Sequence, residues 1–494
     1  MKKLILTCTA VLGLNLCSCD SYLDINQDPN SPAQENLTAD MIMPAAEMNI
    51  AASYGNFLRI VGGYYAQHYS QMFGTSNYQD FSRFEMSATR SSGTYTQLTS
   101  RVLNNLKSVL ELSADAEDWG TYLAATVLRA YTYQILVDCY GEVPYTEALD
   151  PANSTPKYDE GKTIYQGVLA EIDAALAKVS ESDPVCTNFL LPGESAGAWI
   201  QFANALKFKM LMRMSNVVDV KNQLAALVAE DNFPTEDIAW ANCWADETGK
   251  ANPFYQEEFA TYFGSTQTNA ILNIALQGTM AAYDDARLGV YFNANANGVY
   301  TGGVSGTNFS TTASYKAAYW CRPNVAFDDA VSLISVAEIE FFLAEYEARY
   351  GDPAKAATHY ANAVEASFVA AGVSGAEAAL AAYPWDNENY QKSLGVQKWI
   401  ALSGSNNFEA WCEARRLKFP AFGTATGSDI YDVLTDNYDV SKYVPGTLYT
   451  PIQFDTEVGA GKMIQRFPYA ESSANRNNNT PAHKGNGTPI FWAE

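Results

Sequence analysis

The stretch from about Asp329 to Gly372 constrains the fold most, because its apolar residues recur at intervals of three and four. That period places them on one stripe of a helix. The stripes comprise Ile334, Ala337, Phe341, Ala344 and Ala348, and then Ala357, Tyr360 or Ala361, Val364 and Phe368. Between them, Gly351 suits a left-handed helix end, Asp352 an N-cap and Pro353 a first helical turn. The stretch therefore predicts two antiparallel helices, with Gly372 ending the second.

The spacing after Gly351 is that of a tetratricopeptide repeat. Small or aromatic residues fall 5, 9 and 12 positions beyond it, at Ala356, Tyr360 and Ala363, and small residues there let two helices approach closely. Further pairs are expected at 118–139 with 161–179, 196–217 with 219–230, and 388–403 with 406–418. Such hairpins cannot bury their apolar faces alone, so several must stack. We therefore expect a mostly α fold in which tetratricopeptide-like helical hairpins form a curved scaffold.

Long irregular loops separate the expected hairpins. They are chiefly 74–93, 140–160, 240–266, 283–328 and 420–494. Loops this long in a compact domain are usually functional or disordered. The segment 293–314 is rich in Gly, Asn, Ser and Thr, yet it carries Tyr300 and Phe309, which favours a functional role. We expect residues 19–494 to form a single α-helical domain whose loops carry the ligand site.

The first nineteen residues are typical of a bacterial lipoprotein signal. Lys2 and Lys3 precede an apolar stretch, 4–16, that is shorter than the about 20 residues a membrane span needs. The run Leu-Cys-Ser-Cys that ends at Cys19 resembles a lipobox, so we expect residues 1–18 to be removed and Cys19 to be acylated. One acyl chain holds a protein only marginally, whereas three anchor it firmly. The alternative is an ordinary secretory signal with a chance cysteine.

The charge balance excludes a nucleic-acid partner. The chain has 31 Lys and Arg against 55 Asp and Glu, and loss of the signal removes two lysines, which leaves a net charge of −26. Such a surface repels phosphate backbones and lipid headgroups. The other mature cysteines are Cys139, Cys186, Cys243, Cys321 and Cys412. They are scattered and odd in number, so we expect buried thiols with at most one or two disulfides.

The segment Gly193-Glu-Ser-Ala-Gly197 matches the nucleophile elbow of serine esterases. That motif needs a buried strand before the serine and a helix after it. Pro192 stands where the strand should end, and the only later histidines are His359, in an expected helix, and His483, in a polar tail. We interpret Ser195 as a helix N-cap and keep a surface hydrolase as the alternative. No motif for a metal or cofactor site is present, and whether acidic residues bind calcium stays open.

Aromatic residues in the loops are the remaining binding capacity. A sugar's C–H face packs on a flat ring, while Tyr, Asn and Arg bond its hydroxyl groups. Most aromatics fall on expected helices and are assigned to the core. We expect the loop residues to bind ligand, namely Tyr78, Phe81, Tyr300, Tyr315, Trp320 and Arg322. These rings suit glucans, host glycans or peptides equally, and a structural adaptor that grips another protein is a third possibility.

An ordered set of segments resembles one family, the SusD-like (RagB-type) outer-membrane nutrient-binding lipoproteins. The segments are 19–30 (CDSYLDINQDPN), 140–149 (YGEVPYTEAL), 199–213 (WIQFANALKFKMLMR), 337–345 (AEIEFFLAE), 397–402 (QKWIAL), 409–416 (EAWCEARR) and 466–471 (RFPYAE). The likeness covers almost the whole mature chain.

The resemblance implies four tetratricopeptide-like pairs and no catalytic activity. It also implies a partner, a SusC-like TonB-dependent transporter, over which the lipoprotein sits as a hinged lid. Members of the family bind oligosaccharides in most characterised cases and peptides in some. The expected location is the outer membrane, lipid-anchored and facing the cell exterior.

Overall fold

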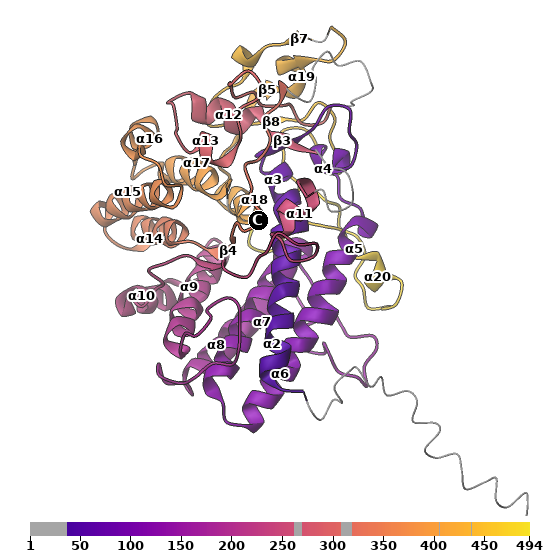
Figure 1. The fold of residues 1–494 in the computed structure, drawn as a ribbon, viewed down its shortest axis with the longest axis vertical. Coiled ribbons are helices and arrows are strands. Elements are labelled where there is room, and N and C mark those ends of the chain that lie inside the picture. The colour runs from indigo at the N-terminus through magenta and orange to yellow at the C-terminus, as the bar shows by residue number, and fades with distance from the viewer. Residues whose placement is uncertain (1–36, 261–268, 308–318, 405, 436) are drawn as a thin grey trace, which may run out of the picture.

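The computed structural model describes residues 37–260, 269–307, 319–404, 406–435 and 437–494, and the described part is mostly helical (Figure 1). Long helices gather at one end, and short elements and loops gather at the other. Two long helical runs come first in the described part of the chain, and each passes through a π-helical segment. The first is α2 (Ala39–Ala52), η3 (Ser53–Leu58) and α3 (Arg59–Tyr65), and the second is α5 (Ala88–Thr96), η4 (Gln97–Leu103) and α6 (Asn104–Asp115).

Four helical pairs lie where the sequence predicts them. They are α7 (Trp119–Tyr140) with α8 (Gly161–Leu176), α9 (Ala196–Met214) with α10 (Lys221–Glu230), α14 (Val336–Tyr350) with α15 (Pro353–Ala370), and α17 (Tyr390–Leu402) with α18 (Asn407–Leu417). The helices of each pair contact one another, and α9 also contacts α7 and α14, while α14 contacts α17. The pairs therefore stack in series, which confirms the predicted tetratricopeptide-like scaffold.

The hairpin of α14 and α15 agrees with its sequence pattern in most details. Ala356, Tyr360 and Ala363 are all buried, and the Asp352 carboxylate accepts from the Ala354 amide at 2.8 Å, so it caps α15. Two expectations were wrong. Ile334 belongs to a strand, because α14 begins only after Ser335. Gly351 has φ −119° rather than a left-handed conformation.

Helix α7 is the centre of the core. It is mostly apolar around its whole circumference, as is typical of a buried helix, and nearly every residue from Leu123 to Tyr140 is buried, including the polar Gln134 and Asp138. Arg129 is the exception, and it pairs with Glu171 on α8. Helix α7 contacts α6, α8 and α9, so the first helical pair is built around it.

Short strands form four two-stranded sheets. They are β1 (Tyr69–Gln71) with β3 (Ala270–Leu272), β2 (Ile238–Trp240) with β4 (Val331–Ile334), and β6 (Tyr431–Asp432) with β7 (Asn437–Tyr438), all antiparallel, and β5 (Phe422–Thr426) parallel to β8 (Leu448–Thr450). The short helices are α4 (Gln79–Ser82), α11 (Pro253–Glu258), α12 (Ile274–Ala281), α13 (Leu288–Tyr291), α16 (Ala376–Ala382), α19 (Gly427–Ile430), η6 (Val440–Lys442) and α20 (Glu471–Ala474). These short elements order the regions that the sequence presents as loops.

Buried charges join the helices of the scaffold. The network comprises Asp138, Lys209, Arg213, Glu338, Glu345, Lys398, Glu409, Glu413 and Arg416, all buried. Arg213 on α9 lies 2.6 Å from Asp138 on α7 and 3.1 Å from Glu413 on α18, and it also pairs with Glu409. These pairs fix the relative positions of helices that are distant in sequence.

The cysteines and the helix lengths bear on disulfide bonding and on membrane insertion. Cys139, Cys186, Cys243, Cys321 and Cys412 are free thiols, of which three are buried and two are half-buried. Among the described helices, none is both long and apolar enough to cross a bilayer.

Candidate functional site

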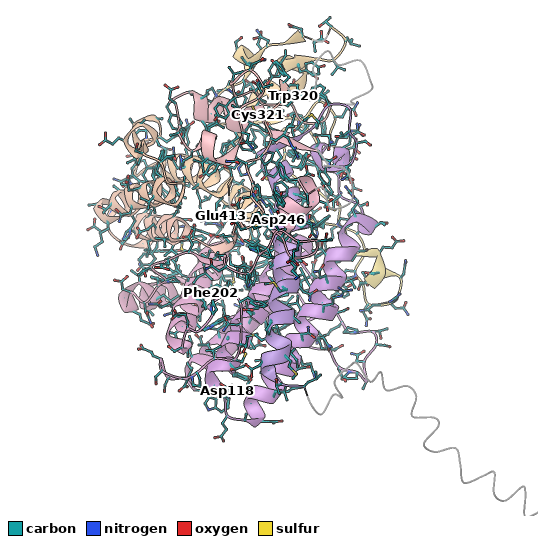
Figure 2. The ribbon with its side chains drawn as sticks, viewed as in Figure 1. Asp118, Phe202, Asp246, Trp320, Cys321 and Glu413 are labelled. Carbon is teal, nitrogen blue, oxygen red and sulfur yellow. The ribbon has the colours of Figure 1, made fainter. Side chains whose placement is uncertain are left out.

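Trp320 lies near the end of the molecule opposite the long helices, in the upper part of Figure 2. Its ring stacks on Phe73 with centroids 4.7 Å apart and an interplanar angle of 1°. Tyr319 meets Trp320 edge-on at 4.9 Å, and Tyr438 does so at 6.1 Å. Tyr431 meets Phe73 at 5.7 Å. We call these five residues the aromatic cluster.

Backbone pairing brings the cluster together from distant parts of the chain. Phe73 follows β1, and β1 pairs with β3. The Leu272 amide of β3 donates to the Cys321 carbonyl at 2.8 Å, which places Trp320 beside the same sheet. Tyr431 and Tyr438 are direct partners across β6 and β7. Each ring is therefore held by a short strand or its neighbour, although the surrounding chain is irregular.

The cluster has covered and accessible rings. Trp320 and Tyr431 are each 3% exposed, whereas Phe73, Tyr319 and Tyr438 are half-buried. Flat rings of this kind can receive the apolar C–H face of a sugar or an apolar side chain. The accessible rings are thus the part of the cluster that a ligand could contact.

Tyr78 and Phe81, two of the predicted ligand residues, are buried against each other. Phe81 belongs to helix α4 and Tyr78 precedes it, and the two are only 1% and 4% exposed. Their rings stack at 5.7 Å, and the Tyr78 hydroxyl donates to Glu257 at 3.0 Å. Burial raises the pKa of Tyr78 above its usual range. Phe81 was expected in a loop and lies in a short helix, whereas Tyr78 does lie outside the helices. Ligand contact by either ring stays a prediction, which their burial disfavours.

Tyr300 and Arg322 both lie close to Trp320 along the backbone: Arg322 follows it by two residues, and the segment of Tyr300 is hydrogen-bonded to Cys321. The Thr301 amide donates to the Cys321 sulfur at 3.1 Å, and the Asn293 amide donates to the Arg322 carbonyl at 2.9 Å. Tyr300 is half-buried. Burial lowers the pKa of Arg322, whose guanidinium lies 4.2 Å from the Phe259 ring centre. The structure therefore brings Tyr300, Trp320 and Arg322 into one region, while Tyr315 lies outside the described residues.

Of the cluster, sequence reasoning selected only Trp320 as a ligand residue. It did not select the adjacent Tyr319, and it missed Phe73, Tyr431 and Tyr438. Phe73 stands one residue before the region read as a loop, and the two tyrosines lie in a C-terminal region without a recognisable pattern. Only the pairing of β1 with β3 and of β6 with β7 places them beside Trp320.

The esterase alternative lacks its structural context. Ser195 occupies the N-cap position of α9, as predicted, but its hydroxyl makes no capping hydrogen bond. The described residues before it form turns, not a strand. The histidines have other partners: His359 bonds Glu340 at 2.8 Å and His483 bonds Glu457 at 2.9 Å. Desolvation lowers the pKa of buried His68 to about 3, so it stays neutral.

One group of side chains in the described part of the chain has the spacing of metal ligands, namely Asp138, Glu409 and Cys412. Arg213 already pairs with both carboxylates. Burial alone would raise the pKa of Glu409, but Arg213 and Lys209 hold it below its usual value. The arginine therefore supplies the positive charge that a metal would bring, and the group is part of the buried network.

One protein family matches this sequence, and many solved structures have a similar fold. The SusD-like description "Starch-binding associating with outer membrane" matches residues 29–435. A SusD homologue from Bacteroides uniformis has 20% identity and a TM-score of 0.71, with 92% of this chain and all of that chain covered. A chitin-binding SusD homologue from Flavobacterium johnsoniae has 17% identity and a TM-score of 0.71, with 91% and 98% covered. No curated protein sequence gives a significant match.

A further solved structure, a SusD-like protein from Bacteroides thetaiotaomicron, has 18% identity and a TM-score of 0.67, with 91% of this chain and 98% of that chain covered. At identities this low the structural likeness shows the fold alone, whereas the family match extends over most of the sequence. The family consists of binding proteins without catalytic activity, which removes the esterase alternative. The chain belongs to the SusD-like family of glycan-binding proteins that associate with the outer membrane.

Proposed function

We propose that this protein captures an oligosaccharide at the cell surface and delivers it to a SusC-like TonB-dependent transporter. The observation that carries the proposal is the aromatic cluster, with three accessible rings from three separate segments at one end of a rigid helical scaffold. Reversible capture needs rings held in place and no reactive group, and the cluster has both properties. The delivery step rests on family membership alone.

The anchor belongs to the same proposal. Cys19 and the signal segment 1–18 lie outside the described residues, so acylation and the boundaries of the 19–494 domain rest on sequence. Three acyl chains would hold the protein on the membrane without a spanning helix. The scaffold would then present the aromatic cluster to solutes and to the transporter.

We place an oligosaccharide before a peptide because of the proteins that share this fold, since the rings alone could receive either ligand. The accessible rings offer flat apolar faces, and sugars pack on such faces through their C–H groups. Two of the structures with this fold are described as chitin-binding, and the family description names starch. Glucans and chitin fragments are therefore the first ligands to test, with peptides as the competing outcome.

Isothermal titration of the unlipidated chain beginning at residue 20 tests the proposal. The probes are maltoheptaose, chitohexaose and a tryptic digest of casein. We expect one oligosaccharide to bind, and Tyr319→Ala to weaken that binding by about tenfold, since losing one aromatic contact costs about 1 to 2 kcal/mol. Tyr122→Ala is the matched control, because Tyr122 is a half-buried tyrosine near the N-terminus of α7.

Two results would contradict the proposal. One is binding of the peptide digest alone, which would change the ligand class. The other is an equal loss of oligosaccharide binding in Tyr319→Ala and Tyr122→Ala, which would place the ligand away from the aromatic cluster. Delivery is tested separately, by co-purification of the lipidated chain from outer membranes with a large β-barrel protein.

A further inference from the structure

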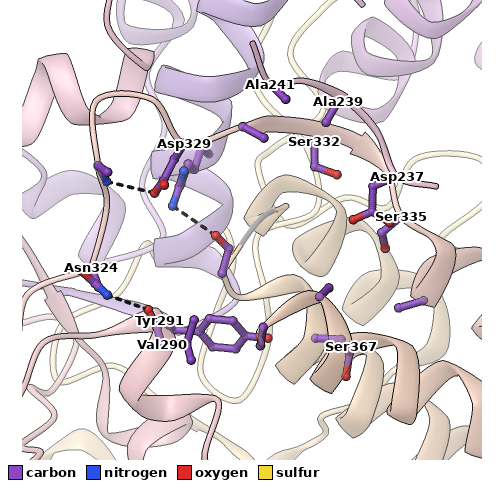
Figure 3. Close-up of a pocket in the computed structure, with 18 residues that line it drawn as sticks. Asp237, Ala239, Ala241, Val290, Tyr291, Asn324, Asp329, Ser332, Ser335 and Ser367 are labelled. Carbon is purple, nitrogen blue, oxygen red and sulfur yellow. Dashed lines mark hydrogen bonds between the residues drawn. The ribbon is translucent and has the colours of Figure 1, made fainter. Parts of the chain in front are cut away.

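A cleft apart from the aromatic cluster lies at the junction of the helical scaffold and the strand pair β2–β4 (Figure 3). It is a cleft of about 540 Å³, within the range of about 300 to 1,000 Å³ typical of small-molecule sites. Arg59, Ser332 and Ser367 line it and are buried, whereas Asp237, Asn324 and Ala370 line it and are exposed. The cleft therefore has a buried floor and an open rim.

Small residues create this space. Eight of the lining residues are alanine and one is glycine, although the cleft lies where α14, α15 and α17 meet the strands. Closely packed interiors normally fill such junctions with larger side chains. The alanines come from separate elements, among them Ala239 of β2, Ala337 of α14 and Ala401 of α17.

Arg59 is the unusual group on the floor. It is only 7% exposed, yet none of the described carboxylates lies within ion-pairing distance of it. Its Nη2 donates to the Gly404 carbonyl at 3.3 Å, its guanidinium lies 4.5 Å from the Phe254 ring centre, and its Nε has no hydrogen-bond acceptor. Buried Arg287, by comparison, pairs with Asp285 at 2.6 Å. A buried charge without an anion is costly, so the floor suits an anionic group.

The other polar groups of the cleft include hydrogen-bond acceptors, so a ligand that fits must also carry hydrogen-bond donors. Asp237 and Asp329 offer carboxylate oxygens that accept hydrogen bonds, and Ser332 on the floor has a buried hydroxyl without a partner. The Asp237 carboxylate accepts a hydrogen bond from the Val336 amide at 2.8 Å. A simple anion would satisfy the arginine but would face these two acids. A hydroxylated anion satisfies both sets of groups.

We infer that the cleft binds one sugar-acid unit of hexuronate type, with its carboxylate on Arg59 and its ring hydroxyls donating to Asp237 and Asp329. The site is separate from the aromatic cluster and shares no residue with it. It would let the protein recognise acidic units of a glycan, or the free sugar acid, independently of ring stacking.

Titration of the unlipidated chain with D-galacturonate, D-galactose and acetate tests the inference. Galactose differs from galacturonate only by a hydroxymethyl group in place of the carboxylate, and acetate carries the carboxylate without the ring. We expect galacturonate to bind at least about tenfold more tightly than either, because a charged hydrogen-bonded pair is lost with galactose and the hydroxyl contacts are lost with acetate. Arg59→Gln should remove the preference for galacturonate.

Two further variants test the cleft without touching Arg59. Ala370→Phe places a ring at the exposed rim and should abolish galacturonate binding. Val369→Phe is its control, because Val369 is the neighbouring residue of α15, is 68% exposed and does not line the cleft. If Arg59→Gln unfolds the protein, Ala370→Phe and Val369→Phe still show whether galacturonate binds in the cleft.

Three results would overturn the inference: galactose or acetate binding as tightly as galacturonate, no galacturonate binding at all, or binding that survives Ala370→Phe. Failure here is distinguishable from failure of the proposed function. Arg59→Gln should leave oligosaccharide binding at the aromatic cluster unchanged, and Tyr319→Ala should leave galacturonate binding unchanged.

Discussion

Replacing Arg213 with methionine perturbs the buried charge network at its centre. The network holds four cations, Lys209, Arg213, Lys398 and Arg416, and five carboxylates, Asp138, Glu338, Glu345, Glu409 and Glu413. Arg213 contacts three of these carboxylates, and its side chain is fully buried. Without it, five acids share three cations away from water. Breaking a buried pair in this way costs about 3 to 5 kcal/mol, a large part of a typical folding free energy of about 5 to 15 kcal/mol.

The loss of folding stability in Arg213→Met should depend on pH in a defined direction. Burial alone would raise the pKa of Glu413, but Arg416 and Lys398 hold it well below its usual value, and Arg213 and Lys209 do the same for Glu409. In the native protein these carboxylates therefore contribute stability above about pH 4.5, which is lost as pH falls below that value. In Arg213→Met the stranded carboxylates take up protons more readily. The difference in stability between variant and native protein should shrink from pH 7 to pH 5.

Urea denaturation at both pH values measures the free energy of unfolding. Lys107→Met is the control, because its exposed pair with Glu111 has side chains 40% and 61% exposed and should matter by less than about 1 kcal/mol. If Arg213→Met is no more destabilising than Lys107→Met at pH 7, or if its loss grows on acidification, the reasoning about the network is refuted.

Three more substitutions have clear expected outcomes. Cys19→Ala should release the protein from the membrane fraction on cell fractionation, and retention there would contradict the lipid anchor. Gly62→Ala should lower the free energy of unfolding by about 1 to 3 kcal/mol, because the added Cβ would lie 2.5 Å from the Phe408 Cα. Gly93→Ala is the control and should be neutral or stabilising, because nothing lies near the Cβ that it adds. Equal effects of the two substitutions would argue against the close approach of α3 and α18. Ser195→Ala should change the urea midpoint very little, since the hydroxyl caps nothing, and a loss of about 1 kcal/mol would show a cap after all.

The helical scaffold was predictable because its signals are local. Apolar spacing and the sequence Asp352-Pro353 locate the α14–α15 hairpin, since caps and helical stripes depend on residues within a few positions of each other. The strand containing Ile334 was missed for the same reason. Ile334, the last residue of β4, fits the apolar stripe of the following helix, and only the pairing of β4 with β2 makes it part of a strand.

The candidate site was predictable only in part. Trp320 was identified from its Gly- and Asn-rich surroundings, but its stacking partner Phe73 is far away in the sequence, and no local pattern links them. Tyr78 and Phe81 were assigned to a loop because helix α4 is only four residues long. Their burial was not predictable because the rings packed against them, Phe57, Tyr64 and Tyr65, come from η3 and α3. The unpaired charge of Arg59 is likewise invisible in sequence, because it depends on where carboxylates from other elements lie.

A crystal structure of the protein with the oligosaccharide that binds in the titration would test the central claim most directly. Density for sugar rings against Phe73, Tyr319 or Tyr438 is the predicted result. An oligosaccharide bound elsewhere, with the aromatic cluster uncovered, would contradict it.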